Sequence, residues 1–523
     1  MLRSTFLGYK TATSALKVNQ NMMDVVGQNI SNINTEGYTR QRLDINSVSF
    51  STSNTKFGTT GVIIGQGVNA TGVSQFRDSF LDLRYRMSAA KTGSEDVQLE
   101  ALSDLELIMD EISKDGLDAQ FSDLLEQLHS LTSSPSDPVL EGVVRTSAEI
   151  LTQMFNDYSR QIDNIRNQQL TYLEDGAIVK VNQLMENIAK LNQQIKEDNI
   201  SGNPALELND ERNMLIDELS NYIDIEIDYE QLSIGGGKTV DELNIYLKLD
   251  TNSKVMIVDN NKASQFISSV PDGQKDVKIE LKKMNGEMVD ITDRIQGGQL
   301  NGYIKFMNGK GEFTDSTDID SKIKGVQYYQ NMLDTLANKF ASTMNDLNRV
   351  VEYNTDGSVK SIKYPDKYLF DSRIDGEEIT AGNIKISDDW AKATESYITN
   401  TTIESTGDSK AATDNILRMI SKFKSKETFE AKPGVGLFKG SFQEFLSFTT
   451  TSLNLQVADA QTSYDTYYES QYQIDFARSS MSSVDLNEEG VNLLQYSKSY
   501  NAAARLMTTL DEMLDTLINR MGV

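Results

Sequence analysis

The chain contains no cysteine and a single histidine among its 523 residues. The lack of cysteine excludes disulfide bonds, thiolate metal sites and thiol nucleophiles. The histidine, His129, falls between Leu128 and Leu131 of a predicted helix, a setting more typical of a structural side chain than of a catalytic base. Without a second histidine, no zinc site of His and Cys ligands can form. We therefore predict no metal, no cofactor and no enzymatic activity.

Basic residues are also scarce. Lys and Arg number 50 against 77 Asp and Glu, which gives a net charge of −27. A surface this acidic repels nucleic acid and anionic lipid, so neither is expected as a partner. No apolar run approaches the length of a bilayer span, and the first residues lack the layout of a signal peptide. Membrane insertion is therefore not expected. Only six prolines are present, which favours long uninterrupted elements.

Although long hydrophobic runs are missing, a regular apolar stripe occupies residues 486–521. Its members are spaced by alternating steps of three and four: Leu493, Tyr496, Tyr500, Ala503, Met507, Leu510, Leu514, Leu517 and Met521. This spacing, kept over about four heptads, is typical of a helix that buries one stripe against another helix. No Gly or Pro lies between Leu493 and Met521, so a long helix is predicted here.

The N-terminal residues 1–30 carry a stripe of the same spacing. It consists of Leu2, Phe6, Tyr9, Ala12, Leu16, Met23, Val26 and Ile30, with only Asn19 polar on that face. We interpret the two stripes as the seams of one coiled-coil element that docks on copies of the same chain. The alternative is that both are core helices of an ordinary bundle.

A polar segment ends the N-terminal helix. It contains Asn29, Asn32, Asn34, Thr35, Gly37 and Tyr38. Asn and Ser side chains compete for backbone hydrogen bonds and so end helices. Thr35-Glu36-Gly37-Tyr38 suits a type II turn, in which Gly37 takes the positive φ of the third position. Residues 40–82 that follow are irregular, with strand-like alternation only near Ile45. They are predicted to be a surface loop or a segment that neighbours order.

Helical spacing resumes at Leu102 and continues, with breaks, to Ile195. Gly176 either kinks this part or is tolerated inside it. Further helices are predicted at 206–220, 319–347 and 442–474, with a short one at 416–423. Between 222 and 307 the apolar residues recur at every second position instead of at helical spacing. They alternate with polar residues, acidic ones in the first segment, and turn signals separate the segments. This alternation predicts a β-rich segment with one buried face. Residues 352–435 are mixed.

The order of these segments is nested and predicts a mainly α fold, a long coiled-coil or helix-bundle rod formed by both chain ends with a β-rich inserted domain. Residues 1–40 and 484–523 would form a terminal coiled-coil domain. Residues 41–221 and 308–483 would form a helical-bundle rod with irregular segments. Residues 222–307 would form an outer β-rich domain. This division is a prediction from changes of period alone.

Motifs that could carry chemistry are weak. Gly237-Lys238-Thr239 lacks the earlier glycine of a phosphate-binding loop, and it falls between predicted strands. Residues 371–376 have an arginine where a calcium loop needs an oxygen ligand. The acidic pairs Asp210/Glu211 and Glu488/Glu489 lie in charged helical contexts, and we interpret them as solvated helix faces.

Several motifs together resemble a known family. Residues 29–41, from Asn29 to Gln41, are similar to the N-terminal signature of flagellar axial proteins, and the Arg40-Gln41 ending is typical of the first hook-associated proteins. Residues 298–302 with 333–337, and the segments 210–220, 484–489 and 512–517, also resemble that family. The 222–307 and 352–435 segments match only loosely. The family usually has Pro where this chain has Glu36, which suggests a looser turn.

The resemblance implies a secreted structural subunit of the bacterial flagellum, located at the hook–filament junction. It would be exported unfolded, with the help of an export chaperone, and assembled with itself as a helical layer. Its neighbours would be the hook protein and the next hook-associated protein or flagellin. The alternatives are a flagellin-like filament or cap subunit, and a secreted adhesin. A wall hydrolase is the weakest alternative, because no catalytic site converges.

Overall fold

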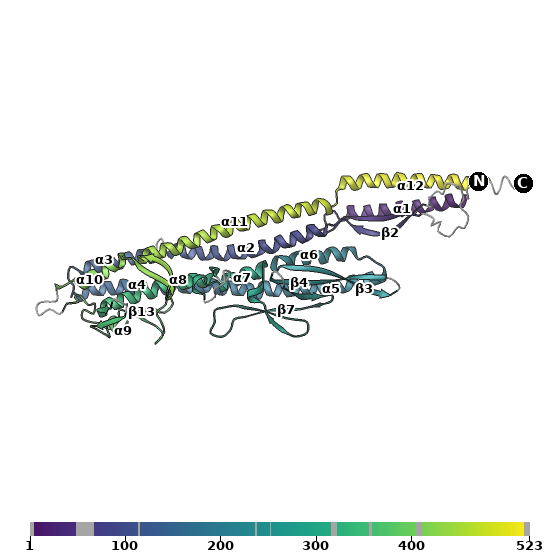
Figure 1. Ribbon diagram of the computed structural model, residues 1–523. Coiled ribbons are helices and arrows are strands. Elements are labelled where there is room, and N and C mark those ends of the chain that lie inside the picture. Colours follow the sequence, from purple (N-terminus) through teal and green to yellow (C-terminus); the bar gives the residue numbers. More distant parts are fainter. Residues whose placement is uncertain are drawn as a thin grey trace.

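The computed structural model describes residues 5–48, 67–112, 116–235, 238–250, 253–314, 322–354, 358–403 and 411–516. The fold is mainly α-helical with several small antiparallel sheets, as predicted. The molecule is elongated, and the first and last helices, α1 (Thr5–Ser31) and α12 (Leu486–Asp515), lie together at one end of it (Figure 1). Among the described residues, no helix combines the length and apolar character that crossing a bilayer requires.

Two long helices, α2 (Ser79–Glu111) and α11 (Phe442–Ser482), run side by side along the elongated helical body of the molecule, which we call the rod (Figure 1). Both have strong start signals. Asp78 caps α2 by accepting a hydrogen bond from the Phe80 backbone N–H at 2.8 Å. Ser441 and Glu444 form a capping box on α11. The helix predicted to begin at Phe442 is therefore confirmed. Helix α2, by contrast, begins more than twenty residues before Leu102, where the helical spacing of apolar residues becomes visible in the sequence.

Further helices complete the rod: α3 (Leu117–Leu131), α4 (Pro138–Thr171), α5 (Val179–Ser201), α6 (Leu206–Tyr222), α7 (Gly298–Asn308) and α8 (Val326–Arg349). A π-helical segment, Tyr172–Ile178, joins α4 to α5 and contains Gly176, so the irregularity considered at this glycine is present. The core is a continuous cluster of buried apolar side chains. At the end of the rod far from the termini it is built on stacked and edge-to-face rings of Phe121, Phe155, Phe340, Phe423 and Phe442.

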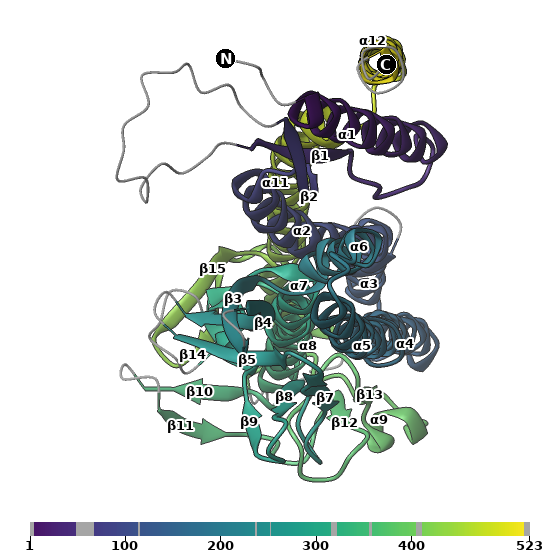
Figure 2. The same ribbon diagram turned by 90° about the vertical axis from the view of Figure 1, so that its right-hand side faces the viewer.

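The terminal helices α1 (Thr5–Ser31) and α12 (Leu486–Asp515) lie side by side, displaced from α11 after a break at residues 483–485 (Figures 1 and 2). We call α1 and α12 the terminal pair. The strands β1 (Gln41–Ser47) and β2 (Val68–Gln75) form an antiparallel ribbon that contacts α1. The strand-like alternation near Ile45 is borne out by β1, whereas the expectation of an irregular segment is wrong for β2 and for the start of α2. The two strands pair across more than twenty residues of sequence, so no local pattern shows the pairing.

Residues 225–290 form the predicted β-rich segment. A four-stranded antiparallel sheet has the order β3 (Ile225–Gly235), β4 (Lys238–Asp250), β5 (Ser253–Asp259) and β6 (Lys262–Ala263). A three-stranded sheet contains β7 (Gln265–Ser269), β8 (Lys278–Lys282) and β9 (Met288–Asp290). After the 3-10 turn Thr292–Arg294, residues 298–308 form helix α7, which packs on α2 and α6. The strand expectation is therefore wrong for the last part of 222–307.

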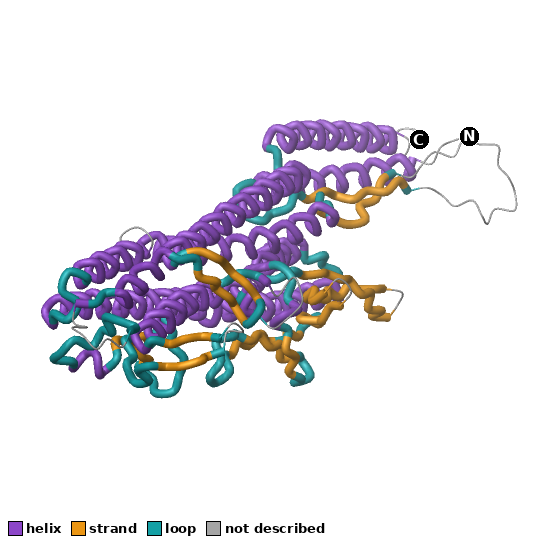
Figure 3. Tube along the Cα trace, turned by 60° about the vertical axis from the view of Figure 1, so that its left-hand side comes forward, coloured by secondary structure: helices purple, strands orange, loops and turns teal. Residues whose placement is uncertain are grey.

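Where the structure describes residues 351–440, they form three two-stranded ribbons and two short helices. The ribbons pair β10 (Val351–Tyr353) with β11 (Val359–Ile362), β12 (Phe370–Ser372) with β13 (Ile384–Ile386), and β14 (Glu427–Lys432) with β15 (Val435–Gly440). The helices are α9 (Asp388–Lys392) and α10 (Asp414–Lys424), the second of which was predicted. A further 3-10 turn spans Gly311–Phe313. Figure 3 shows most of the strands of the molecule gathered along one side of the helices.

Candidate assembly site

The polar segment after α1 forms the joint between the terminal pair and the rod. Its turn is the predicted one, because the Tyr38 N–H donates to the Thr35 carbonyl at 3.2 Å and Gly37 has φ +75°. A residue with a Cβ would be strained at this φ. The turn reverses the chain from α1 into β1 and places Gly37 against Met214 of α6. We call residues 32–41 the joint, together with the segments that they contact: the end of α1, the end of α11 and the starts of α6 and α12.

Asn29 holds the joint together from inside. It is 1% exposed. Its Nδ2 donates to the Gln41 carbonyl at 2.9 Å and to Glu489 Oε2 at 3.2 Å, while its Oδ1 accepts from the Gln41 N–H at 2.9 Å and the Tyr38 hydroxyl at 3.0 Å. One side chain thereby connects the end of α1, the start of β1 and the start of α12. Because the amide is buried, each of these bonds would be costly to leave unmade.

Arg40 is the second connection. Its Nε donates to Glu489 Oε1 at 2.8 Å, and its two terminal nitrogens donate to the two Glu488 oxygens at 3.0 and 2.9 Å. The Arg40 N–H also donates to the Ser482 carbonyl, the last residue of α11, at 2.8 Å. The guanidinium lies over the Phe76 ring, 5.1 Å from its centroid. Arg40 thereby connects the end of α11 with the start of α12.

The joint is also fastened to α6. The Thr39 N–H donates to Asp210 Oδ2 at 2.9 Å, and Gln41 Nε2 donates to Glu207 Oε1 at 3.1 Å. Asp210 is 5% exposed, and burial raises the pKa of its carboxyl group. The interpretation of the two acidic pairs as solvated faces is therefore wrong for Asp210 and for Glu489, which is 1% exposed. Thr39 lies 171 positions from Asp210, and Asn29 lies 460 positions from Glu489, so no local pattern could reveal these contacts.

A second ionic cluster lies directly beside the joint. It joins Asp82 and Arg86 of α2, Asp217 of α6 and Arg478 of α11. Arg86 Nε approaches Asp217 Oδ1 at 2.6 Å, and Arg478 Nη1 lies 3.6 Å from Asp82 Oδ1. The charges balance within the cluster, which offsets the cost of removing them from water. These ion pairs therefore connect three helices, α2, α6 and α11, in the part of the rod next to the joint.

The terminal pair buries its predicted seams only in part. Gly8 of α1 lies against Leu510 of α12, since a Cβ on Gly8 would be 3.3 Å from Leu510 Cδ1. The pair is antiparallel, because Asn29 meets Glu489 at the other end.

Of the α1 seam, Ala12 and Val26 are buried and Leu16, Met23 and Ile30 are half-buried, whereas Tyr9 is exposed. The α12 seam residues Tyr496, Tyr500, Ala503, Met507, Leu510 and Leu514 are half-buried, and Leu493 is exposed. Leu2, Leu517 and Met521 lie outside the described residues, as does the side chain of Phe6.

The remaining motif residues have local roles. Asn32 accepts a hydrogen bond from the Thr35 hydroxyl at 3.2 Å and donates to the Gln28 carbonyl at 3.0 Å. Asn34 is exposed, and no side-chain hydrogen bond is found for it within the described ranges. The sequence therefore identified the turn correctly. It missed Glu489 and Asp210 as structural partners, although residues 484–489 and 210–220 both belong to the segments that resemble the family.

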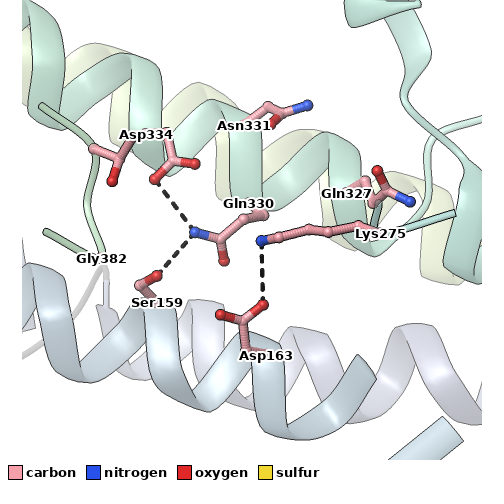
Figure 4. Close-up of a pocket in the computed structure, with 9 residues that line it drawn as sticks. Ser159, Asp163, Lys275, Gln327, Gln330, Asn331, Asp334 and Gly382 are labelled. Carbon is pink, nitrogen blue, oxygen red and sulfur yellow. Dashed lines mark hydrogen bonds and ion pairs between the residues drawn. The ribbon is translucent and has the colours of Figure 1, made fainter. Parts of the chain in front are cut away.

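No catalytic arrangement is found in the part of the chain that the structure describes, and no group of three or more potential metal ligands gathers there. His129 is exposed on α3. A pocket of about 360 Å³ with polar lining residues lies between α4 and α8, and Lys275 and Gly382 border it (Figure 4). Gln330 Nε2 donates there to Ser159 and Asp334, at 2.9 and 3.3 Å.

Asp334 in this cavity gives the rod a pH-dependent stability. Burial raises the pKa of Asp334 to about 6, above its ordinary 3.8. Lowering the pH from 7.5 to 5 lets the folded chain take up a proton that the unfolded chain does not bind, so the unfolding free energy rises, by roughly 1–3 kcal/mol from this group. Asp334→Asn should raise the melting temperature at pH 7.5 and reduce its increase on acidification, as measured by circular dichroism.

The control for this prediction is Asp157→Asn, which changes an exposed carboxylate on the neighbouring α4. It should leave the pH profile of the melting temperature as in the parent chain. If Asp334→Asn also left the profile unchanged, the raised pKa would be contradicted.

Comparisons with known proteins cover the whole of this arrangement. The model of the flagellar hook-associated protein FlgK helical domain matches residues 102–359. The models of the flagella basal body rod protein and of the flagellar basal body rod FlgEFG protein C-terminal match residues 10–39 and 478–521, which contain most of the terminal pair and much of the joint.

Flagellar hook-associated protein 1 of Bacillus subtilis is 28% identical over 537 aligned residues, with 100% of this chain and 99% of that protein covered. The Escherichia coli protein of the same name is 24% identical over 64% of this chain and 55% of its own length. A solved structure of the flagellar hook junction protein FlgK from Burkholderia pseudomallei aligns with TM-score 0.42 and 17% identity over 55% of this chain and 46% of that chain. The chain belongs to the FlgK family of flagellar hook-associated proteins, which are structural components of the flagellum and not enzymes.

Proposed function

We propose that the chain forms the junction between hook and filament by assembling with copies of itself through coiled-coil contacts of its terminal helices. One observation carries this proposal. Among the described residues of α12, only Glu489 is fully buried. A helix of 30 residues whose apolar seam is only half covered by α1 has too little packing to be stable by itself. Further copies would supply the missing contacts.

The outward face of α12 supports this view. Four large apolar side chains stand on it, each 48–63% exposed: Val491, Leu494, Leu506 and Met513. Exposed apolar side chains at helical spacing are typical of a surface that a partner covers. Each such side chain contributes roughly 1.5–3 kcal/mol when it is fully buried. The net negative charge of −27 would keep single chains apart until these stripes meet.

The joint gives the terminal pair a defined direction relative to the rod. Without Asn29, Arg40 and Glu489, the break at residues 483–485 would let α12 swing freely. In the proposed layer the terminal domain, residues 1–40 and 484–523, would be innermost. The rod domain, 41–221 and 308–483, would surround it, and the β-rich 222–307 would be outermost. The neighbours would be the hook protein on one side and the next hook-associated protein or flagellin on the other, with a chaperone acting before export.

Deleting the gene and localising the tagged chain would test the proposed function. Cells without the chain should assemble hooks but no filaments, and a tagged chain that restores growth should be found at the distal end of purified hooks. Electron microscopy with gold-labelled antibody is the measurement. Filaments of normal number in the deletion strain, or label spread along the whole filament, would contradict the proposal.

A further inference from the structure

Positive charge gathers on the middle of the terminal pair, although the chain as a whole carries a net charge of −27. It belongs to four exposed side chains, two on α1 and two on α12: Lys10, Lys17, Lys498 and Arg505. Positions 5–23 of α1 and 490–510 of α12 contain no acidic residue. No ion pair of these four side chains is found among the residues that the structure describes. The described part of the chain therefore leaves this positive charge unneutralised.

On α12 the positive charges share a line with apolar side chains. Val491, Lys498 and Arg505 follow one another seven positions apart, which is about two turns of helix, so they stand on one face. Leu494 lies one turn after Val491 on that face, and both are 63% exposed. None of these residues belongs to the seam toward α1. We call Val491, Leu494, Lys498 and Arg505 the basic row.

Helix α11 carries the opposite charge along its exposed side, and it contains no Lys or Arg before Arg478. Asp465 and Glu469 lie one turn apart and are exposed. Within the described ranges each accepts a hydrogen bond from a glutamine of the same helix, at 2.9 and 2.8 Å, and neither makes an ion pair. Leu455 and Phe476, 63% and 70% exposed, lie on the same face. We call Leu455, Asp465, Glu469 and Phe476 the acidic row.

The acidic row faces away from the rod. The buried residues of this part of α11 are Leu453, Ala460 and Ile474, which lie on the other side of the helix. At 1.5 Å per residue the acidic row is roughly 30 Å long. It is therefore an extended surface of apolar and acidic side chains that the chain's own rod does not cover.

We infer that the basic row of one copy docks on the acidic row of a second copy, with the two helices running in the same direction. This inference rests on the proposed self-assembly and names the surface of the rod that receives α12. The two rows match in spacing. On α12, Val491 lies 14 positions before Arg505. On α11, Leu455 lies 14 positions before Glu469. Apolar side chains therefore meet at the start of both rows when the opposite charges meet further along.

This register sets each cation of the basic row against a carboxylate. Arg505 meets Glu469, and Lys498 comes within one helical turn of Asp465. The contact combines apolar area with opposite charge, and both are needed for a specific surface between chains that repel one another overall. Because the two rows lie on different helices of the same chain, the contact is head-to-tail and repeats from copy to copy.

The direction of α12 explains why the partner is a second copy. Helix α12 continues beyond the end of α11 and does not fold back along it (Figure 1). The basic row therefore cannot reach the acidic row of its own chain. Copies related by the same rotation and translation about one axis all point the same way, so their α11 and α12 helices run in the same direction, as the register requires. Nucleic acid and anionic lipid, which positive charge also attracts, would be repelled by the net charge of the chain.

Charge reversal in cells is the test. Lys498→Glu/Arg505→Glu reverses the basic row, and Asp465→Lys/Glu469→Arg reverses the acidic row. Each set alone should lower the number of filaments per cell about tenfold or more, because like charges then face each other. Both sets in one chain should bring the number back to within about threefold of the parent. The matched control, Lys278→Glu/Lys282→Glu, changes exposed lysines of the β-rich segment and should leave filament numbers unchanged.

Cross-linking measures the contact directly and also serves where a charge-reversed chain fails to fold. Because the chain has no cysteine, Val491→Cys/Leu455→Cys carries one thiol on each row. Oxidation of purified hook preparations with diamide should give multimers on a gel run without reductant, since a disulfide forms where the two Cβ atoms lie about 4 Å apart. Val491→Cys alone and Leu455→Cys alone should stay monomeric.

Reversed chains collected from the medium should show the parent's circular dichroism spectrum and melting temperature, so that a folding defect is told apart from an assembly defect. The inference would be overturned if either reversed set left filament numbers normal, or if the combined chain, exported and folded, stayed without filaments. Absence of multimers from the paired thiols in cells that grow filaments would overturn it too. The proposed function would stand in each case, because it depends on deletion and localisation of the parent chain.

Discussion

Replacing Leu510 by aspartate is expected to abolish filament growth while leaving the melting temperature of the free chain unchanged. Leu510 is half-buried near the end of the terminal pair that is far from the joint, where it lies against Gly8. A carboxylate at this position has no partner, and covering it in an assembled layer would cost several kcal/mol. The rod has its own continuous core, which does not include α12. The loss should therefore affect assembly and not the cooperative unfolding of the rod.

The measurements for this variant are filament counts by electron microscopy and thermal melting of the secreted chain. Leu510→Met, which keeps the volume and the apolar character, is the control and should support normal growth. If Leu510→Asp instead lowered the melting temperature as much as a substitution in the rod core does, the terminal pair would be part of an ordinary core. The alternative of two bundle helices would then be correct.

Replacing Glu489 by alanine is expected to release α12 from the rod. The Glu489 carboxylate is almost fully buried and accepts from Arg40 and Asn29, so its loss leaves a guanidinium and an amide without their buried acceptor. Removing one partner of such a buried pair costs roughly 3–5 kcal/mol. Amide hydrogen exchange in the first turns of α12 should accelerate by about a hundredfold or more. Filament growth should fall as well, because the terminal pair loses its direction.

The neighbouring Glu488 supplies a matched control. It contacts the same Arg40 with both oxygens, but its side chain is 56% exposed. An exposed pair contributes only about 0.2–1 kcal/mol, so Glu488→Ala should change exchange in α12 by less than about tenfold. Equal effects of the two substitutions would show that the joint depends on net negative charge at the start of α12 and not on the buried contact.

Much of the helical fold is visible in the sequence because its signal is local. The apolar spacing of α4, α5, α8 and α12 reports which residues face a neighbouring helix, and the alternation in β3 and β4 reports a sheet with one buried face. The turn at Gly37 is also a local property, since a positive φ and a hydrogen bond three residues apart involve no distant partner. These features followed from period and turn chemistry alone.

The first half of α2 shows why other parts stayed hidden. Its buried face contains Ser88, Thr92, Gly93 and Ser94 instead of large apolar residues, so no apolar period appears. Small residues are needed there because backbones come close together. A Cβ on Gly93 would lie 2.2 Å from the Asn221 carbonyl oxygen, and one on Gly302 of α7 would lie 2.6 Å from the Ser94 carbonyl oxygen. In the sequence, the small and polar residues that such close packing requires are the same as those of a polar loop.

The sequence by itself determined that this chain is a long, mainly helical, non-catalytic protein whose two ends carry matching apolar seams, because composition and periodicity act within a few turns of chain. Only the tertiary structure decided how the ends are joined to the rod. Asn29 and Glu489 are 460 positions apart, and Thr39 and Asp210 are 171 apart. A carboxylate becomes a buried hydrogen-bond acceptor only when folding brings a donor to it and removes the surrounding water. The residues next to it in sequence do not indicate whether this happens.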